Sequence, residues 1–165
     1  MSAGLRAVRH EDLLLITLEH PSGLPRLERG VLRELERQIN RLVAAREFVG
    51  AVITGSARAF CAGAELGDIT SLMGAESLEF AREGQSVMER IERSAKAVIA
   101  AVRGYCMGGG FDLALACRGA SRAEMLCLRI VGRRSGWLRD GRDAAVGAID
   151  WRGADDRHSC DGTGD

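Results

Sequence analysis

Short apolar runs alternate along this chain with stretches whose apolar residues recur at helical spacing, and this alternation limits the folds open to it. A short apolar run closed by Gly or Pro is typical of a buried strand, whereas a repeat of about 3.6 residues is typical of an amphipathic helix. The sequence predicts strands at 13–18, 51–54 and 97–102, and helices at 31–43, at 77–94 and from 111 to 117. Strands and helices in alternation predict an α/β fold.

The composition excludes several classes of protein. The 165 residues fit one domain with a sizeable core. Because 23 basic residues balance 23 acidic ones, the chain lacks the positive field of a nucleic-acid or membrane-surface binder. No apolar run reaches the roughly 18 residues of a membrane span, and residues 1–11 lack the layout of a signal peptide. We therefore expect a cytoplasmic protein with neither nucleic acid nor membrane as partner.

The cysteines are odd in number and include no Cys-x-x-Cys pair, which disfavours both a disulfide framework and a zinc site. We expect no bound metal, and we expect most of the cysteines to be small packing residues. They are Cys61, Cys106, Cys117, Cys127 and Cys160.

The chain changes character after Cys117. Residues 118–165 hold nine arginines, eight glycines and seven aspartates, and outside 125–131 their apolar residues keep no clean period. A reading-frame shift in a GC-rich gene would produce such a tail. We therefore divide the chain into a core, 1–117, and an atypical tail, 118–165, which we expect to be poorly ordered with at most a short strand or helix at 125–131.

Two glycine-rich loops each follow a predicted strand. The first loop spans residues 54–66, and the second loop, residues 102–113, opens into a helix. Small residues let a ligand approach the backbone, and amides at a helix N-terminus attract an anion. Two such loops can aim one N–H each at a single oxygen, as an oxyanion hole requires. Taken alone, the glycines at 108–110 also fit a turn or a close-packing device, and neither loop has nucleotide-binding spacing.

The two loops together resemble a known family. The pattern Ile-Thr-Gly-x-x-x-Ala-Phe-Cys-Ala-Gly-Ala-Glu-Leu, followed by Gly-Tyr-x-x-Gly-Gly-Gly-x-Asp-Leu-Ala, is similar to the crotonase superfamily, which contains the enoyl-CoA hydratases and isomerases. The resemblance covers residues 13–117. It implies an α/β core of repeated β-β-α units, here cut short, and an acyl-CoA thioester as substrate, with coenzyme A entering as part of that substrate and no separate cofactor.

The resemblance also implies a role for particular residues. The backbone N–H groups of Ala64 and Gly109 would polarise the thioester carbonyl, and Asp112 stands where hydratases of the family carry a catalytic glutamate. Some family members, among them dienoyl-CoA isomerases, resemble this chain in having Asp there. The alternative for Asp112 is an acid that stabilises the first turn of its helix. The implied substrate-binding residues are Arg26, Ala62, Ala64, Glu65, Leu66 and Gly109.

Arg26 and Glu65 fit the family pattern less closely than the other residues. Arg26 would suit the CoA phosphates, but the surrounding Pro-Arg-Leu departs from the family's usual Asn-Ala-Leu. For Glu65, a polar loop residue near the CoA site is a better interpretation than a catalytic acid.

The family's second acid, in a Pro-Glu-x-x-x-Gly context, has no counterpart in 118–165, where Glu124 is the one glutamate and no proline precedes it. Three hypotheses follow: an enoyl-CoA hydratase or isomerase, most simply hydrating 2-enoyl-CoA; a non-catalytic binder of CoA thioesters; and an incomplete product that does neither.

The region through which family members form trimers also has no counterpart in this sequence. We therefore expect the helix faces at 31–43 and 78–91 to be partly uncovered and to favour self-association.

Overall fold

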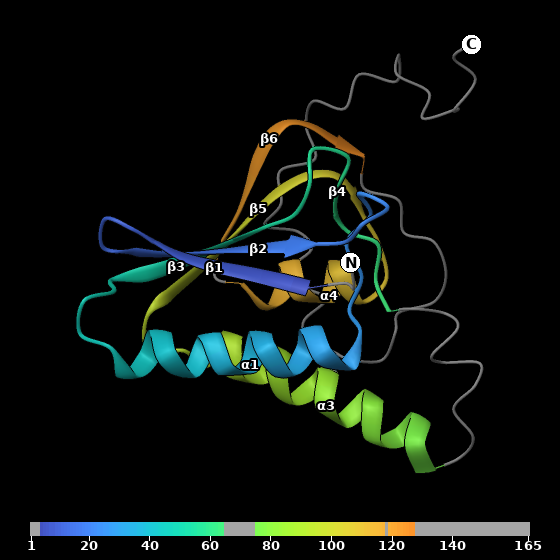
Figure 1. The fold of residues 1–165 in the computed structure, drawn as a ribbon, viewed down its shortest axis with the longest axis horizontal. Coiled ribbons are helices and arrows are strands. Elements are labelled where there is room, and N and C mark those ends of the chain that lie inside the picture. The colour runs from blue at the N-terminus through green and yellow to red at the C-terminus, as the bar shows by residue number, and fades with distance from the viewer. Residues whose placement is uncertain (1–3, 65–74, 118, 128–165) are drawn as a thin grey trace.

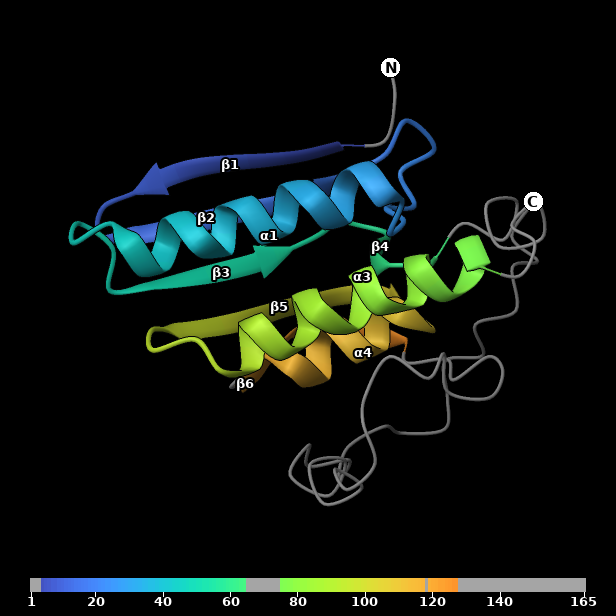
Figure 2. The ribbon, with the colours of Figure 1, turned by 90° about the horizontal axis from the view of Figure 1, so that it is seen from below.

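A mixed sheet and three helices make up the fold of residues 4–64, 75–117 and 119–127, which the computed structural model describes (Figure 1). The strands are β1 (Gly4–His10), β2 (Leu13–Glu19), β3 (Gly50–Thr54), β4 (Ala59–Cys61), β5 (Ala97–Cys106) and β6 (Gly119–Cys127). The helices are α1 (Arg29–Ala44), α3 (Ala75–Glu92) and α4 (Gly109–Ala116). Viewed from below, α1 runs along the strands β1–β3, and α3 and α4 lie beside β5 (Figure 2).

The strand β5 organises the sheet, whose order is β1-β2-β3-β5-β4 with β6 also paired to β5. Its first half pairs with β3 and its last residues pair with β4, so one long strand joins two short ones. Only β1 runs antiparallel to its neighbour among these described strands. Parallel strands carry their following loops at the same sheet edge, which brings the segments after β4 and β5 together.

The predicted α/β class is confirmed, and β2, β3, β5 and the three helices lie where the periodicity places them. The strand β5, however, continues beyond its predicted end at Val102, passing Gly104 at φ +63°. The sequence analysis did not find β1 or β4. The edge strand β1 is half-exposed and lacks a clear alternation, and β4 has only three residues.

The expectation for the tail is corrected in its first part. The strand β6, Gly119–Cys127, pairs in parallel with β5 from Ile99↔Gly119 to Tyr105↔Cys127. A nine-residue strand therefore replaces the predicted short element at 125–131, because the neighbouring strand supplies hydrogen-bond partners that periodicity does not report. Residues 128–165 lie outside the described residues.

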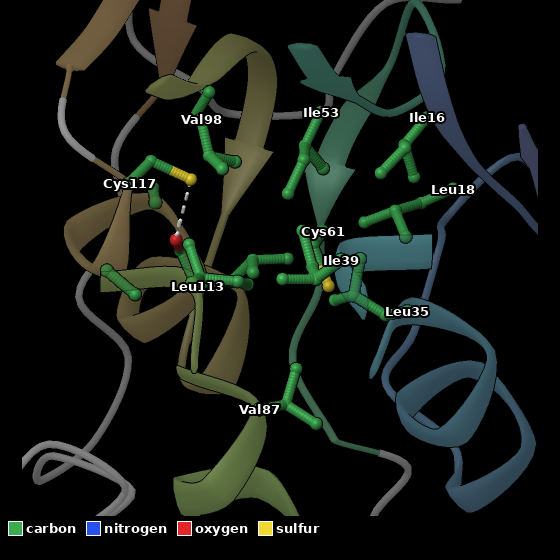
Figure 3. Packing of buried hydrophobic residues seen from close by; sticks show 14 of the residues in the cluster. Ile16, Leu18, Leu35, Ile39, Ile53, Cys61, Val87, Val98, Leu113 and Cys117 are labelled. Atoms are coloured by element: carbon green, nitrogen blue, oxygen red, sulfur yellow. Dashed lines mark hydrogen bonds between the residues drawn. The ribbon is translucent and has the colours of Figure 1, made fainter. Parts of the chain in front are cut away.

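The core lies between the sheet and the helices (Figure 3). Leu35 and Ile39 of α1 point toward Ile16 and Leu18 of β2, and all four are at most 1% exposed. On α3 the buried apolar residues are Phe80, Val87, Met88 and Ile91. The expectation of uncovered helix faces is thus wrong for most of their length, since α1 and α3 pack on each other.

The exceptions lie at the ends of the predicted faces. Val43 is 47% exposed and Leu78 is 53% exposed, so at these two positions the faces are uncovered, as expected. No helix in the described ranges is long and apolar enough to cross a membrane.

Polar contacts reinforce the helices from the outside. Arg29 pairs with Glu79 across the α1–α3 contact at 3.6 Å, and Arg90 pairs with Glu36 at 3.1 Å. Lys96, the chain's single lysine, donates from Nζ to the carbonyl oxygens at the end of α1, at 2.8 Å for Leu42. These carbonyls have no partner within the helix, so the ammonium group caps it.

Replacing Leu35 by Ala will lower the free energy of unfolding by about 2–5 kcal/mol, because it leaves a cavity in the fully buried core. The matched change Leu78→Ala, at an exposed position of α3, will alter it by less than about 0.5 kcal/mol. Urea denaturation followed by circular dichroism measures both. Equal losses in the two variants would contradict this assignment of the core.

Candidate functional site

The first and second loops meet because β4, which lies within the first loop, pairs with the end of β5. Cys61 and Cys106 are register partners in these two parallel strands. Just beyond them, the N–H of Met107 donates to the carbonyl oxygen of Cys61 at 3.0 Å. The backbone that follows β4 and the backbone that follows β5 therefore run side by side.

A third segment, residues 25–27, borders the first loop on its other side. The N–H of Ala62 donates to the carbonyl oxygen of Pro25 at 2.8 Å, and the N–H of Leu27 donates to that of Gly63 at 2.8 Å. Leu27 and Ala64 form an isolated parallel bridge. The stretch 62–64 is thus held by backbone hydrogen bonds, with no side chain interposed at these contacts.

Glycine is required where the two loops touch. Gly63 adopts φ +92°, and a Cβ on it would lie 2.9 Å from the carbonyl oxygen of Met107 and 3.3 Å from the nitrogen of Gly109. A Cβ on Gly110 would lie 2.4 Å from the carbonyl oxygen of Cys61. Both distances to oxygen are shorter than real side chains allow, so the loops approach backbone to backbone.

Two backbone N–H groups at this contact have no backbone acceptor among the described residues. At the start of α4, the N–H groups of residues 110–112 donate to the carbonyl oxygens of Met107 and Gly108. Within the described ranges, the N–H groups of Gly109 and Ala64 donate to no backbone carbonyl. Gly109 is the first residue of α4, where the helix dipole adds to the attraction for an anion.

Asp112 lies in the first turn of α4 and is only 3% exposed. Its backbone N–H donates to the carbonyl oxygen of Gly108 at 3.1 Å. The Asp112 carboxylate is near Cys106, since after burial and the Cys61 thiol it contributes to raising the pKa of the Cys106 thiol to about 12. The acid is therefore buried on the same helix whose first residue is Gly109.

The structure brings together Ala62, Ala64, Gly109 and Asp112 of the predicted site. Arg26 is half-buried in the segment that borders the first loop. Glu65 and Leu66 lie outside the described residues. The roles assigned to all of them stay predictions.

The sequence analysis missed Pro25 and Leu27, which position the first loop. They act through a backbone carbonyl and a backbone N–H, so their side-chain identities give little sign of it. The one signal of this role in the sequence is a Pro followed closely by an apolar residue just before a helix.

The thiols around the site are packing groups, as predicted for Cys61, Cys106 and Cys117. All three are buried and free, and Cys117 donates a hydrogen bond to the carbonyl oxygen of Leu113 at 3.3 Å (Figure 3). Burial raises the pKa of Cys61 and of Cys117 to about 12 as well. Among the described residues, no group of three His, Cys, Asp or Glu side chains is placed to hold a metal ion.

This mixed sheet, with two glycine-lined loops in contact at the start of a helix, has the architecture of the crotonase structures. The enoyl-CoA hydratase from Bacillus anthracis superposes with a TM-score of 0.72 at 26% identity, over 75% of this chain and 49% of that one. The family model for enoyl-CoA hydratase/isomerase matches residues 9–123. The chain belongs to this family.

Two curated relatives illustrate how much of the family's length is present. A protein of Bacillus subtilis named "Probable enoyl-CoA hydratase" is 37% identical over 67% of this chain and 43% of its own length. The crotonyl-CoA hydratase of Syntrophomonas wolfei is 33% identical over 66% of this chain and 42% of its own. The chain therefore spans less than half the length of these relatives, and the part matched by the family model, residues 9–123, includes both loops.

Substituting Gly63 by Ala will destabilise the fold by about 2 kcal/mol or more, because the added Cβ meets backbone and φ +92° strains an L-residue. Gly30→Ala is the matched control, since a Cβ there has nothing within 4 Å and lies in α1. That change will be neutral or stabilising by up to about 1 kcal/mol. Thermal unfolding of both variants measures the difference, and a tolerated Gly63→Ala would show that the loops are not in backbone contact.

The buried thiols will resist alkylation in the folded chain. With a pKa of about 12, Cys61 at about pH 9 will react with iodoacetamide about 500-fold more slowly than in the urea-unfolded chain, in proportion to its thiolate fraction. Because the folded state holds the proton more tightly, this group's contribution to stability is lost as pH rises from 9.0 toward 12. Peptide mass spectrometry measures the rates. Equal rates in folded and unfolded chain would contradict the burial of Cys61.

Proposed function

We propose that this chain binds an acyl-CoA thioester between its two loops and stabilises the thioester enolate, most simply during hydration of a 2-enoyl-CoA. The observation that carries the proposal is the pair of N–H groups of Ala64 and Gly109 where the loops meet, which donate to no backbone carbonyl in the described part of the chain. Membership in the enoyl-CoA hydratase/isomerase family supports it.

In the proposed reaction the thioester carbonyl oxygen accepts hydrogen bonds from both N–H groups. As water adds to C3 of the enoyl group, electrons move through the double bond onto this oxygen. Donors that are already in place stabilise the charge without reorganising, and the N-terminus of α4 adds its dipole. The backbone thus supplies the electrostatic part of catalysis.

Asp112 is the proposed proton acceptor. Its carboxylate, buried in the first turn of α4, would take a proton from the attacking water, and a proton must then be delivered to C2. An Asp carboxylate sits roughly 1.5 Å further back than the family's Glu, about one bond length along the side chain. The water must therefore approach α4 more closely, or the substrate must lie deeper between the loops.

The remaining predicted residues extend the site toward the coenzyme A part of the substrate. Ala62, with Glu65 and Leu66, is proposed to border the adenine, and Arg26 to face the phosphates. Arg26 lies between Pro25 and Leu27, whose backbone groups bond to the first loop, so it borders the part of the site that Ala62 occupies.

Binding without turnover is the second candidate function. It is favoured by the sequence of residues 118–165, which lacks the Pro-Glu-x-x-x-Gly context of the family's second acid. Protonation of C2 would then have no dedicated donor on this chain, whereas the N–H groups would still bind the thioester.

The variant Asp112→Asn, measured beside the unaltered chain, will separate the hydratase from the non-catalytic binder. It preserves size and shape but removes the proton acceptor, so hydration of crotonyl-CoA will fall by roughly 10²–10⁴ while the affinity for coenzyme A stays within about twofold. Loss of the conjugated thioester absorbance measures turnover, and calorimetric titration measures affinity. Binding with no turnover in the unaltered chain supports the binder, and absence of both refutes the proposed function.

A further inference from the structure

The hydroxyl group of Ser56 joins the first loop to the segment that precedes α1. Its Oγ donates to the carbonyl oxygen of Gly23 at 2.6 Å, with the carbonyl oxygen of Ala59 as a longer alternative acceptor at 3.3 Å, and it accepts the N–H groups of Arg58 and Ala59, each at 3.1 Å. A hydroxyl has one proton and two lone pairs, so these contacts use its whole capacity. Neither the predicted site nor the proposed mechanism includes this residue.

The Ser56 contact begins a series that ends at Ala64. Three connections follow one another in the same order along residues 23–27 and 56–63: Ser56 with Gly23, Ala62 with Pro25, and Gly63 with Leu27. The bridge between Leu27 and Ala64 comes next. The last connections use backbone groups, which every substitution except that to proline leaves in place, whereas the first depends on a side chain.

The second loop is held from a different side. Met107 donates its N–H to the carbonyl oxygen of Cys61, and the N–H of Gly110 donates back to Met107 at 2.9 Å. These bonds involve no residue of the 23–27 segment. Loosening that segment therefore shifts Ala64 more than Gly109.

We propose that Ser56 is a positioning residue that sets the direction of the Ala64 N–H by holding residues 23–27 against the first loop. The consequence for ligand binding rests on the function proposed above; the coupling between Ser56 and the first loop does not. Removing the hydroxyl should weaken one of the two hydrogen bonds to the thioester oxygen and leave the other intact.

Amide hydrogen exchange tests the coupling without any ligand. In Ser56→Ala, exchange at the amides of Ala62 and Leu27 will speed up by about tenfold, the factor that one ordinary hydrogen bond represents. Exchange at Met107 will change by less than about twofold. Unchanged protection at Ala62 and Leu27, or equal loss at Met107, would overturn the proposal.

Three further variants complete this test. Ser22→Ala removes a hydroxyl from the turn that contains Gly23; within the described residues this hydroxyl is hydrogen-bonded to His20 and Leu24, so its loss should leave Ala62 protected. Ser56→Thr keeps the hydroxyl and should restore protection. If Ser56→Ala does not fold, Ser56→Cys takes its place, since a thiol is a weak donor of similar shape. Its exchange must then speed up at Ala62 and Leu27 by a smaller factor, and not at Met107.

Binding of an aryl-substituted enoyl-CoA tests the consequence, because hydrogen bonds that polarise its carbonyl shift its absorbance to longer wavelength. In Ser56→Ala this shift will shrink and the thioester will bind about tenfold more weakly, while free coenzyme A binds unchanged. A full shift in the variant overturns the role of Ser56. No binding by the unaltered chain refutes the proposed function instead, and the exchange experiment then decides the coupling alone.

Discussion

The arrangement of this site depends on the parallel pairing of β4 with the end of β5. That pairing places the carbonyl oxygen of Cys61 over the N–H of Met107, and it leaves no space for a side chain at Gly63 or Gly110. Any displacement of one strand along the other would separate the two loops, because their contact is made mainly between backbone atoms. The central position of β5, paired with β3, β4 and β6, resists such a displacement.

A site built from backbone N–H groups depends on how the neighbouring N–H groups are satisfied. Amides at a helix N-terminus lack partners within the helix, and leaving them without a hydrogen bond away from water is unfavourable. The first turn of α4 satisfies the N–H groups of residues 110–112 internally and leaves that of Gly109 for an external acceptor. The neighbouring thiols are held neutral by burial, so they add no competing charge near Asp112.

Membership in the enoyl-CoA hydratase/isomerase family agrees with this arrangement, since the matched residues 9–123 contain both loops, α1, α3 and α4. The chain spans less than half the length of its curated relatives, yet its core is well packed around α1 and β2. The strand β6 extends the sheet beyond Cys117 by pairing in parallel along β5, and the family match also continues beyond Cys117, to residue 123.

Sequence alone determined the α/β class, the positions of the main strands and helices, and the two loops with their family resemblance. Periodicity reports which face of an element is apolar, and glycines report where backbone comes close. Only the tertiary structure decided which surfaces cover those faces, leaving Leu78 exposed while Leu35 is buried. It also decided that Lys96 caps α1, that Pro25 and Leu27 hold the first loop, and that the N–H groups of Ala64 and Gly109 donate to no backbone carbonyl of residues 4–64, 75–117 and 119–127. Hydrogen bonds between distant backbone groups leave no mark on residue identity, because almost every amino acid carries the same N–H and C=O.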